Sequence, residues 1–345
     1  MLCQFKSRDG GSSLRCVFRS ATPGHPDRQV LEAMSFCMGE EFGETYSDPR
    51  VYDVDALADM VKTGRLITCA AISEDGDPVA VISVKECPPF QGVGDLSMHV
   101  VRRPYRGFGV GTPLVQFIMD LPETKALSSV ISHSATYHSI AQHESYRVGL
   151  RPCGALYSFH INALLEHSFQ KVGAKQSFLI AAKAEKKRHA GVIFPPPEHR
   201  DFLLDVYRSL GVDCTVGEAP LPPSGSTVLS VEENALHQLL VGKLDRCGSD
   251  LARLAEEHLK RRQSSSPLGT ATLFLNLQDP AAPYGYRILT GLGFRFSGLH
   301  PLCGEGEYLI LHHPLEVQVP FPEFRVDDEY LPVFDYLRDH FNDHC

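Results

Sequence analysis

The sequence predicts an α/β protein, and three observations bear on its fold class and organisation. Segments of alternating apolar residues, typical of strands, are interleaved along the 345 residues with segments whose apolar residues recur at helical spacing. The turn Glu74–Pro78, which contains Asp75-Gly76, separates two apolar runs and predicts an antiparallel hairpin. The length suits two domains, at roughly 100–200 residues each.

In the first half of the chain, strands and helices alternate. The first helix carries Leu31, Met34 and Met38 on one side, and the second follows an aspartate cap at Asp53 or Asp55. We expect strands at 14–19, 66–73, 79–85, 95–101, 128–133, 153–161 and 176–184. We expect helices at 26–38, 55–61, from a glycine-rich turn to about 121, and at 137–148.

A basic cluster, Lys183–His189, marks the expected boundary between two domains, which we assign to residues 12–186 and 190–316, with a C-terminal extension at 317–345. In the second half we expect strands at 191–194, 228–231, 272–277, 294–298 and 308–312. We expect helices at 195–210, two within 232–263, one at 282–292 and a short one at 329–341. The segments Tyr146–Gly154 and Leu289–Gly298 echo each other and suggest an internal duplication.

Composition excludes several classes of protein. The net charge of −9 argues against nucleic acid or an anionic membrane as the main partner, because both require a surplus of cations. No stretch approaches the ~18–20 apolar residues of a membrane helix, and the N-terminus lacks the order of a signal peptide. The ten cysteines include no C-x-x-C pair. We therefore expect a cytoplasmic protein with reduced, mostly buried thiols, and nothing singles out a catalytic cysteine.

The most informative segment is Val100–Thr112, in which a predicted strand ends, a turn contains Gly107, Gly109 and Gly111, and a helix begins. Glycines let the backbone turn tightly and bring N–H groups close to a ligand. The start of the helix adds unpaired N–H groups and the positive end of the helix dipole. Together they predict an anion site suited to a pyrophosphate.

The spacing of these glycines excludes two familiar phosphate loops. Thr112 stands where a G-x-G-x-x-G dinucleotide fingerprint would continue, and the Gly-Lys-Ser/Thr of a Walker loop is absent. Arg106-x-x-Gly109-x-Gly111 instead resembles the R/Q-x-x-G-x-G/A loop of the GNAT acetyltransferase superfamily. That resemblance implies acetyl-CoA as cosubstrate, bound by these residues: Val100, Val101, Arg106, Gly107, Phe108, Gly109, Val110, Gly111, Thr112 and His138.

The resemblance extends beyond the loop. Thr136-Tyr137-His138-x-x-x-Gln142 looks like a helix of large bacterial tandem-GNAT chains, whose second copy ends as Asp279–Gly298 does here. It implies two GNAT-like domains in tandem, each with a central mixed sheet flanked by helices. The second half keeps only Gly248 near the equivalent turn, Leu244–Ser249. We therefore expect one active site, in the first half, and a degenerate second copy.

Catalysis by direct attack of an amine on the thioester needs a base and an acid. Asp95, Ser97 and His99 alternate along one strand, so we expect them on one face, with Asp95 or His99 as the base. The family's acid is a tyrosine four residues before the helix-capping glycine, where this chain has Ser145. Tyr146 is then the candidate acid and Tyr137 the alternative.

Two functions are compatible with the sequence. The first is an acetyl-CoA-dependent N-acetyltransferase acting on a primary amine of a small molecule or a protein, with a mild preference for cationic acceptors from the negative charge. The second is a non-catalytic acyl-CoA sensor or partner-binding scaffold, suggested by Ser145 and the decayed second loop. We expect no metal, no nucleic acid and no membrane partner, and the oligomeric state is open.

Overall fold

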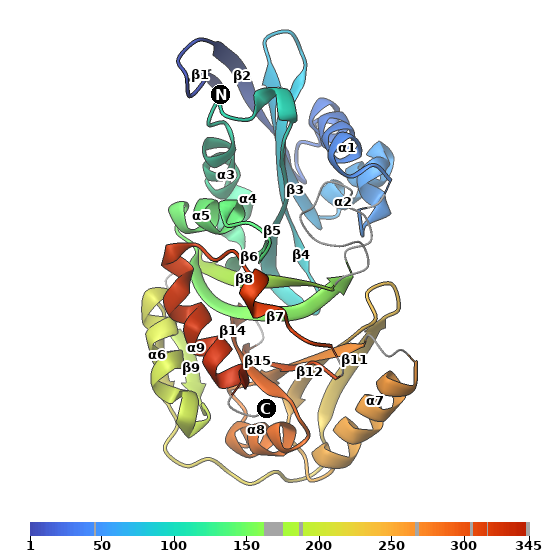
Figure 1. The fold of residues 1–345 in the computed structure, drawn as a ribbon, viewed down its shortest axis with the longest axis vertical. Helices are drawn as coiled ribbons and strands as arrows, with labels where there is room; N and C mark the ends of the chain where they lie inside the picture. Colours follow the sequence, from blue (N-terminus) through green and yellow to red (C-terminus); the bar gives the residue numbers. More distant parts are fainter. Residues whose placement is uncertain are drawn as a thin grey trace.

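The computed structural model describes residues 1–44, 46–161, 175–185, 189–265, 269–303, 306–315 and 317–342. Within these residues one mixed sheet of 13 strands runs through the molecule, in the order β1-β2-β3-β4-β5-β6-β8-β7-β14-β15-β13-β12-β11. Helices cover its faces (Figure 1). Residues 186–188, inside the basic cluster, and Cys345 lie outside the described residues.

The first half of the chain forms one end of this sheet. Its strands are β1 (Leu2–Lys6), β2 (Ser13–Ala21), β3 (Leu66–Ser73), β4 (Pro78–Cys87), β5 (Phe90–Val101), β6 (Ser129–Ala135), β7 (Arg151–Ile161) and β8 (Lys175–Ala184). Its helices are α1 (Arg28–Phe42), α2 (Val54–Lys62), α3 (Gly111–Met119), α4 (Pro122–Ala126) and α5 (Ile140–Arg147). Helices α1 and α2 cover one face of the sheet, and α3, α4 and α5 lie on the other (Figure 1).

The second half forms the other end. Its strands in the large sheet are β11 (Val228–Asn234), β12 (Leu239–Arg246), β13 (Thr270–Asn276), β14 (Arg295–Cys303) and β15 (Gly306–His313). A separate parallel pair consists of β9 (His189–Ile193) and β10 (Asp213–Val216). The helices are α6 (Arg200–Ser209), α7 (Leu251–Ser265), α8 (Ala282–Gly291) and α9 (Leu331–Asn342).

The two halves share one pattern of strand order and direction. In the first half β4 and β5 are antiparallel, β5 and β6 are parallel, and β8 lies antiparallel between β6 and β7. In the second half β11 and β12 are antiparallel, β12 and β13 are parallel, and β15 lies antiparallel between β13 and β14. Helix α7 therefore follows β12 in the same way as α3 follows β5.

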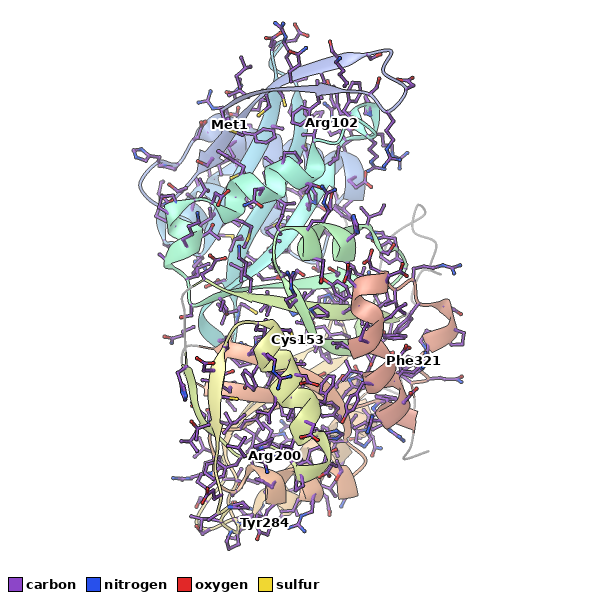
Figure 2. All side chains as sticks on the ribbon, turned by 90° about the vertical axis from the view of Figure 1, so that its left-hand side faces the viewer. Met1, Arg102, Cys153, Arg200, Tyr284 and Phe321 are labelled. Carbon is purple, nitrogen blue, oxygen red and sulfur yellow. The ribbon has the colours of Figure 1, made fainter. Side chains whose placement is uncertain are left out.

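The halves meet through equivalent strands, β7 and β14, which pair at Gly154 and Gly298. A Cβ atom at Gly298 would lie 2.4 Å from the Cα atom of Gly154, so only glycine allows this approach. Helix α9 packs across the junction on both strands (Figure 1). In Figure 2, Cys153 and Phe321 lie in this middle band, while Met1 and Tyr284 lie toward opposite ends of the molecule.

The structure corrects several of the expected elements, the largest correction being in the second half. The segment 232–263 does not hold two helices, because β11 continues to Asn234 and β12 precedes the single helix α7. The run Leu239–Leu244 is apolar and short, and such a run fits a strand or a helix equally well by periodicity. This run forms a strand because it pairs with β11 on one side and β13 on the other. Strands β1 and β10 were also not expected.

The cysteines agree with the expectation of buried thiols. Among those with described side chains, Cys16, Cys37, Cys69, Cys153 and Cys247 are buried, and Cys3, Cys87 and Cys214 are partly exposed. Burial raises the pKa of the Cys16 thiol to about 11. No helix among the described residues is both long enough and apolar enough to span a bilayer.

Candidate active site

The parallel strands β5 and β6 pair at only one end. Their register stops at Leu96–Ser132, although β5 continues to Val101. Just beyond, Met98 has a φ of 54°, and β5 carries an extra residue relative to its other neighbour, β4. The strands therefore part at a bulge, which leaves the backbone of β5 beyond Leu96 open on its β6 side.

The turn from β5 to α3 uses its glycines in two different ways. Gly107 and Gly109 have φ values of 90° and 77°, and a Cβ atom on either would meet nothing within 4 Å. Backbone conformation, not space, therefore requires glycine at these two positions. At Gly111, where α3 begins, a Cβ atom would lie 2.7 Å from Glu144 Oε1 and 3.2 Å from His99 Cε1. Position 111 therefore requires glycine because the side chains of Glu144 and His99 pack directly against its backbone.

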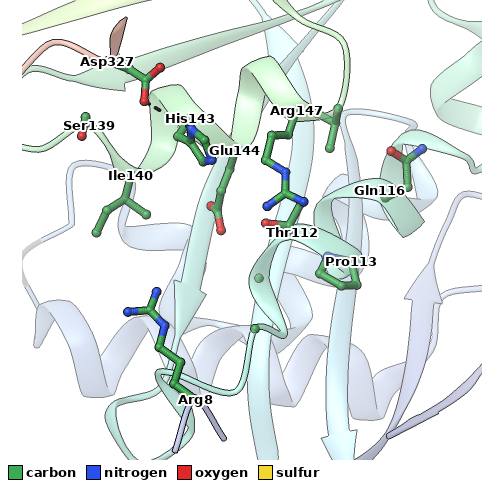
Figure 3. Close-up of a pocket in the computed structure, with 13 residues that line it drawn as sticks. Arg8, Thr112, Pro113, Gln116, Ser139, Ile140, His143, Glu144, Arg147 and Asp327 are labelled. Carbon is green, nitrogen blue, oxygen red and sulfur yellow. Dashed lines mark ion pairs between the residues drawn. The ribbon is translucent and has the colours of Figure 1, made fainter. Parts of the chain in front are cut away.

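No backbone N–H group from 107 to 112 donates to another described residue. Three of these residues, Gly109, Gly111 and Thr112, line a cavity of about 820 Å³. Figure 3 shows α3 and α5 forming two of its walls. The lining residues are Arg8, Gly109, Gly111, Thr112, Pro113, Gln116, Ser139, Ile140, His143, Glu144, Arg147, Val148 and Asp327. The bend thus opens onto a cavity and is not filled by a side chain of the described chain.

His99 and Glu144 form a hydrogen-bonded pair beneath this turn. His99 Nδ1 lies 3.0 Å from Glu144 Oε2, and both side chains are about four-fifths buried. His99 Nε2 is buried and has no hydrogen-bond partner among the described residues. A carboxylate that accepts a hydrogen bond from Nδ1–H leaves Nε2 as an acceptor. With hydrogen on Nδ1, the unshared electron pair of the imidazole lies at Nε2. His99 itself is absent from the cavity lining, and Glu144 is the member of the pair that lines the cavity.

Asp95 and His99 do not share a face, which corrects the expectation from strand alternation. The bulge at Met98 places Met98 and Val100 in the core under α1 and turns His99 toward α5. Asp95 lies on the α1 side, with its carboxylate 3.0 Å from His133 Nδ1 and 3.7 Å from Lys85 Nζ.

The charge of Asp95 is held by these two partners. Burial alone would raise the pKa of this carboxyl, but the imidazole of His133 and the ammonium of Lys85 lower it below its ordinary value of 3.8. Burial likewise opposes the charge of Lys85, and Asp95 raises the pKa of that lysine. Asp95 is thus a carboxylate engaged in a buried ion pair, and it is absent from the lining of the cavity.

Other residues expected to bind the cosubstrate are divided between the cavity and its support. Gly109, Gly111 and Thr112 line the cavity. Arg106 turns away toward α1, where its guanidinium donates to Glu41 and to the carbonyl of Val101, both at 2.8 Å. Four other residues expected to bind acetyl-CoA have side chains that pack against the core: Val100, Val101, Phe108 and Val110. Arg106 therefore anchors the base of the turn.

The candidate acids are not in the cavity. The Tyr146 ring lies under the Arg151 guanidinium, 4.3 Å from its carbon to the ring centroid, and is absent from the lining. Tyr137 packs edge-on against His138, which is half-buried and also absent from the lining. Burial lowers the pKa of His138 and favours its neutral form.

The C-terminal segment closes one side of the cavity. Gln142 on α5 holds it, because its amide nitrogen donates to the carbonyl of Arg325 at 2.9 Å and its oxygen accepts from the N–H of Asp327 at 2.8 Å. The Asp327 carboxylate then pairs with His143 at 3.3 Å, as Figure 3 shows. Tyr330 follows in the core, where its hydroxyl lies beside Ser145.

The equivalent turn of the second half, between β12 and α7, is occupied by the protein itself. The N–H of Cys247 donates to the carboxylate of Asp279 at 2.6 Å, and the N–H of Gly248 donates to the Thr227 hydroxyl at 3.1 Å. The N–H of Ser249 donates to a backbone carbonyl at 3.0 Å. Strands β12 and β13 also stay paired from Leu239–Thr270 to Leu244–Leu275.

Sequence reasoning missed the side chains that α5 and the two ends of the chain contribute to the cavity. Ile140, His143, Glu144 and Arg147 recur at helical spacing and all line it, so the periodicity of α5 contained a signal for Glu144 and Arg147. Arg8 and Asp327 come from opposite ends of the chain. Only the fold brings these two to the site, and no local pattern announces them.

Comparison with known families assigns the segment that builds this site. Residues 31–149 match the acetyltransferase (GNAT) family. The match begins in α1 and ends at the glycine that follows α5, so it contains the parted strands, the glycine turn and the His99–Glu144 pair. Over these residues, about a third of the chain, the sequence is similar to the GNAT acetyltransferases.

Solved structures similar to the chain overlap about half of it. Mutant forms of the spermidine/spermine N-acetyltransferase SpeG from Vibrio cholerae are 14% identical over 49% of this chain and 94% of theirs, with a TM-score of 0.37. The protein yncA from Salmonella typhimurium, solved with its cofactor acetyl-CoA, is 13% identical over 50% and 95%, with a TM-score of 0.39. The ribosomal-protein-S5-alanine acetyltransferase from Vibrio fischeri is 11% identical over 49% and 92%, with a TM-score of 0.36. A search of curated proteins gives no match.

Proposed function

We propose that the first half of the chain is an acetyl-CoA-dependent N-acetyltransferase that acetylates a primary amine by direct attack. One observation carries this proposal: a row of free backbone N–H groups, at the start of α3, borders a cavity beside two parted parallel strands. Such N–H groups bind phosphates, and the helix dipole adds to that attraction. The acceptor would be an amine of a small molecule or a protein.

The residues present fit acetyl-CoA in three respects. The cavity of about 820 Å³ lies within the usual range for ligand sites, ~300–1,000 Å³. The turn at Gly107–Gly111 can approach a pyrophosphate closely, because no side chain projects from its glycines. The edge of β5 beyond Leu96 is open on its β6 side, where the N–H of Val101 could bind an amide of the pantetheine arm, while the carbonyl of Val101 is taken by Arg106. Bound there, acetyl-CoA supplies an activated acetyl thioester.

His99 is the base in this proposal. Its Nε2 accepts the proton that the amine loses as the new C–N bond forms, and Glu144 holds the imidazole in the tautomer with hydrogen on Nδ1. Asp95, whose carboxylate is bound by His133 and Lys85, has a structural role instead. Glu144 is a positioning residue.

The proton can then pass to the departing thiolate from His99 itself. Tyr137, Tyr146 and His99 are all absent from the cavity lining, but His99 is hydrogen-bonded to Glu144, which does line it, so we assign the acid step to His99. The bond between carbon and sulfur breaks, and the sulfur takes the proton that His99 Nε2 had accepted. One imidazole thus acts first as base and then as acid.

The absence of a tyrosine from the described cavity lining supports a second candidate function, an acyl-CoA sensor without turnover. Ser145 stands at the position of the expected acid, and the Tyr330 hydroxyl lies beside it in the core. In this case the cavity would bind the thioester, and the C-terminal segment, through Asp327, would report its presence to a partner.

We also propose that the second half is a degenerate GNAT-like copy that supports the first. The repeated strand order and the self-occupied turn at Cys247–Ser249 favour the division into 12–186, 190–316 and an extension at 317–345, except that β1 and Arg8 extend the first unit to before residue 12. In this scheme the second copy does not bind acetyl-CoA.

Two measurements test the proposed function. Calorimetry with acetyl-CoA on the native chain and on Gly109→Glu should give binding that the variant loses, because a glutamate repels phosphate and strains the turn. Equal binding by both would refute the site. Release of free thiol across a panel of amines then separates the candidates: turnover on an amine supports the transferase, and tight binding with no turnover on any amine supports the sensor.

A further inference from the structure

Two arginines reach the cavity from opposite sides. Arg8 belongs to the turn between β1 and β2, and Arg147 ends α5. Figure 3 shows both side chains pointing into the space beside the glycine turn, with Glu144 between them. Strand β1 lies at the end of the sheet, so Arg8 is an addition from the periphery of the first half.

The turn that carries Arg8 is held firmly. The Asp9 carboxylate accepts hydrogen bonds from the Ser7 hydroxyl and from the N–H of Gly11. These contacts lower the pKa of Asp9. The N–H of Ser7 also donates to the carbonyl of Ser12 at 3.0 Å. Asp9 is therefore engaged within the turn by Ser7 and Gly11, and Arg8 beside it reaches the cavity.

Both guanidiniums lack a carboxylate partner within the described chain. The two acidic residues of the cavity are engaged elsewhere, since Glu144 pairs with His99 and Asp327 pairs with His143. Neither Arg8 nor Arg147 forms an ion pair with another described residue. In a protein with a net charge of −9, two unpaired cations beside one cavity concentrate attraction for an anion there.

We propose that Arg8 and Arg147 bind the 3′-phosphate on the ribose of acetyl-CoA and so select the full coenzyme over carriers without this group. This inference rests on the proposed function. In the proposed site the N–H groups of the glycine turn bind the pyrophosphate. The 3′-phosphate is then the one anionic group of acetyl-CoA for which no binding residue has been assigned. A guanidinium matches phosphate oxygens geometrically and keeps its charge at any physiological pH.

The test compares acetyl-CoA with 3′-dephospho-acetyl-CoA, by calorimetry, on the native chain, Arg8→Gln and Arg147→Gln. We expect the native chain to bind acetyl-CoA about tenfold more tightly than the dephospho form, as befits a charge-assisted contact. Each variant should lose most of that ratio by weakening acetyl-CoA binding and leaving the dephospho form nearly unchanged. Arg253→Gln, on α7 in the second half, removes the same charge far from the site and should keep the native ratio.

The dependence of the affinity ratio on salt concentration is an independent test. Raising the ionic strength should reduce the native ratio more than that of either variant, because the contact is electrostatic. Equal affinity of the native chain for both ligands would overturn the inference and leave the proposed function intact. A variant that weakens both ligands equally would also overturn it. Failure of the native chain to bind either ligand would refute the proposed function itself.

Discussion

The β5–α3 turn and the β12–α7 turn occupy equivalent places in the two halves, yet only the first is open. At the first, the strands part after Leu96 and the N–H groups face a cavity. At the second, the strands stay paired and Asp279 caps the N–H of Cys247. The same strand order thus supports two outcomes, and a few local contacts decide between them.

This difference identifies what a site requires beyond the fold. The left-handed backbone conformation of Met98 allows β5 to separate from β6. The glycines at 107 and 109 allow a turn in which the N–H groups have no hydrogen-bond partner in the described chain. In the second half the backbone packs so closely around Gly248 that a Cβ atom there would lie 2.2 Å from the backbone nitrogen of Thr227, so this position requires glycine. A strand–turn–helix unit is therefore a scaffold, and the site depends on what its N–H groups bind.

The largest expected effect is on turnover. His99→Gln should lower kcat by about 10²–10⁴-fold, because it removes the base, while the affinity for acetyl-CoA stays near native. Glu144→Gln should lower kcat less and leave KM for acetyl-CoA almost unchanged, since its role is to position the imidazole. His258→Gln on α7 is the matched control and should have native kinetics. Native kcat in His99→Gln would remove His99 from the mechanism.

The next effect is on stability. Asp95→Asn should lower the free energy of unfolding by about 3 kcal/mol near neutral pH, because Lys85 would be left buried without its countercharge. Since the pKa of Asp95 is lower in the folded chain than its ordinary 3.8, its contribution is present above pH ~4 and lost as the pH falls below it. Chemical denaturation of both proteins across pH measures the difference.

A control and a contrary outcome sharpen this prediction. Asp59→Asn, on the exposed surface of α2, should change the free energy of unfolding by under about 0.5 kcal/mol. If Asp95→Asn instead kept native stability and lost turnover while still binding acetyl-CoA, Asp95 would be a catalytic group after all.

The smallest effects separate the two turns. Gly109→Ala should cost about 1 kcal/mol of unfolding free energy from its left-handed backbone, and should weaken acetyl-CoA binding. Gly248→Ala should cost about 1–3 kcal/mol, because its Cβ meets the backbone, with acetyl-CoA binding unchanged. Thermal unfolding and calorimetry on both variants give the comparison. Weaker binding in Gly248→Ala would show that the second turn takes part in the site.

The glycine turn of the candidate site could be predicted from sequence, and the failures elsewhere in the site have physical causes. The glycine spacing at 107–111 and the stripe of α3 are local patterns, and both lie where they were expected. The prediction that Asp95 and His99 share a face was wrong. Met98, with its positive φ, reverses the alternation of side chains along the strand, and nothing in the sequence indicates this. Arg8 and Asp327 reach the cavity only through the fold.

The second half was predicted less well for a related reason. Strand β12 is a short apolar run that becomes a strand through its neighbours β11 and β13, which are distant in sequence. The loss of a full glycine motif near Gly248 did indicate a closed turn, but the closing group, Asp279, lies 31 residues beyond that glycine. Contacts of this range follow from tertiary structure.

The stoichiometry of acetyl-CoA binding tests most directly whether only one of the two equivalent turns is open. Calorimetric titration should give one acetyl-CoA per native chain, none for Gly109→Glu, and still one for Asp279→Ala, in which the cap of the second turn is removed. Two bound molecules per native chain, or binding that survives Gly109→Glu and disappears in Asp279→Ala, would contradict the assignment of the site to the first half.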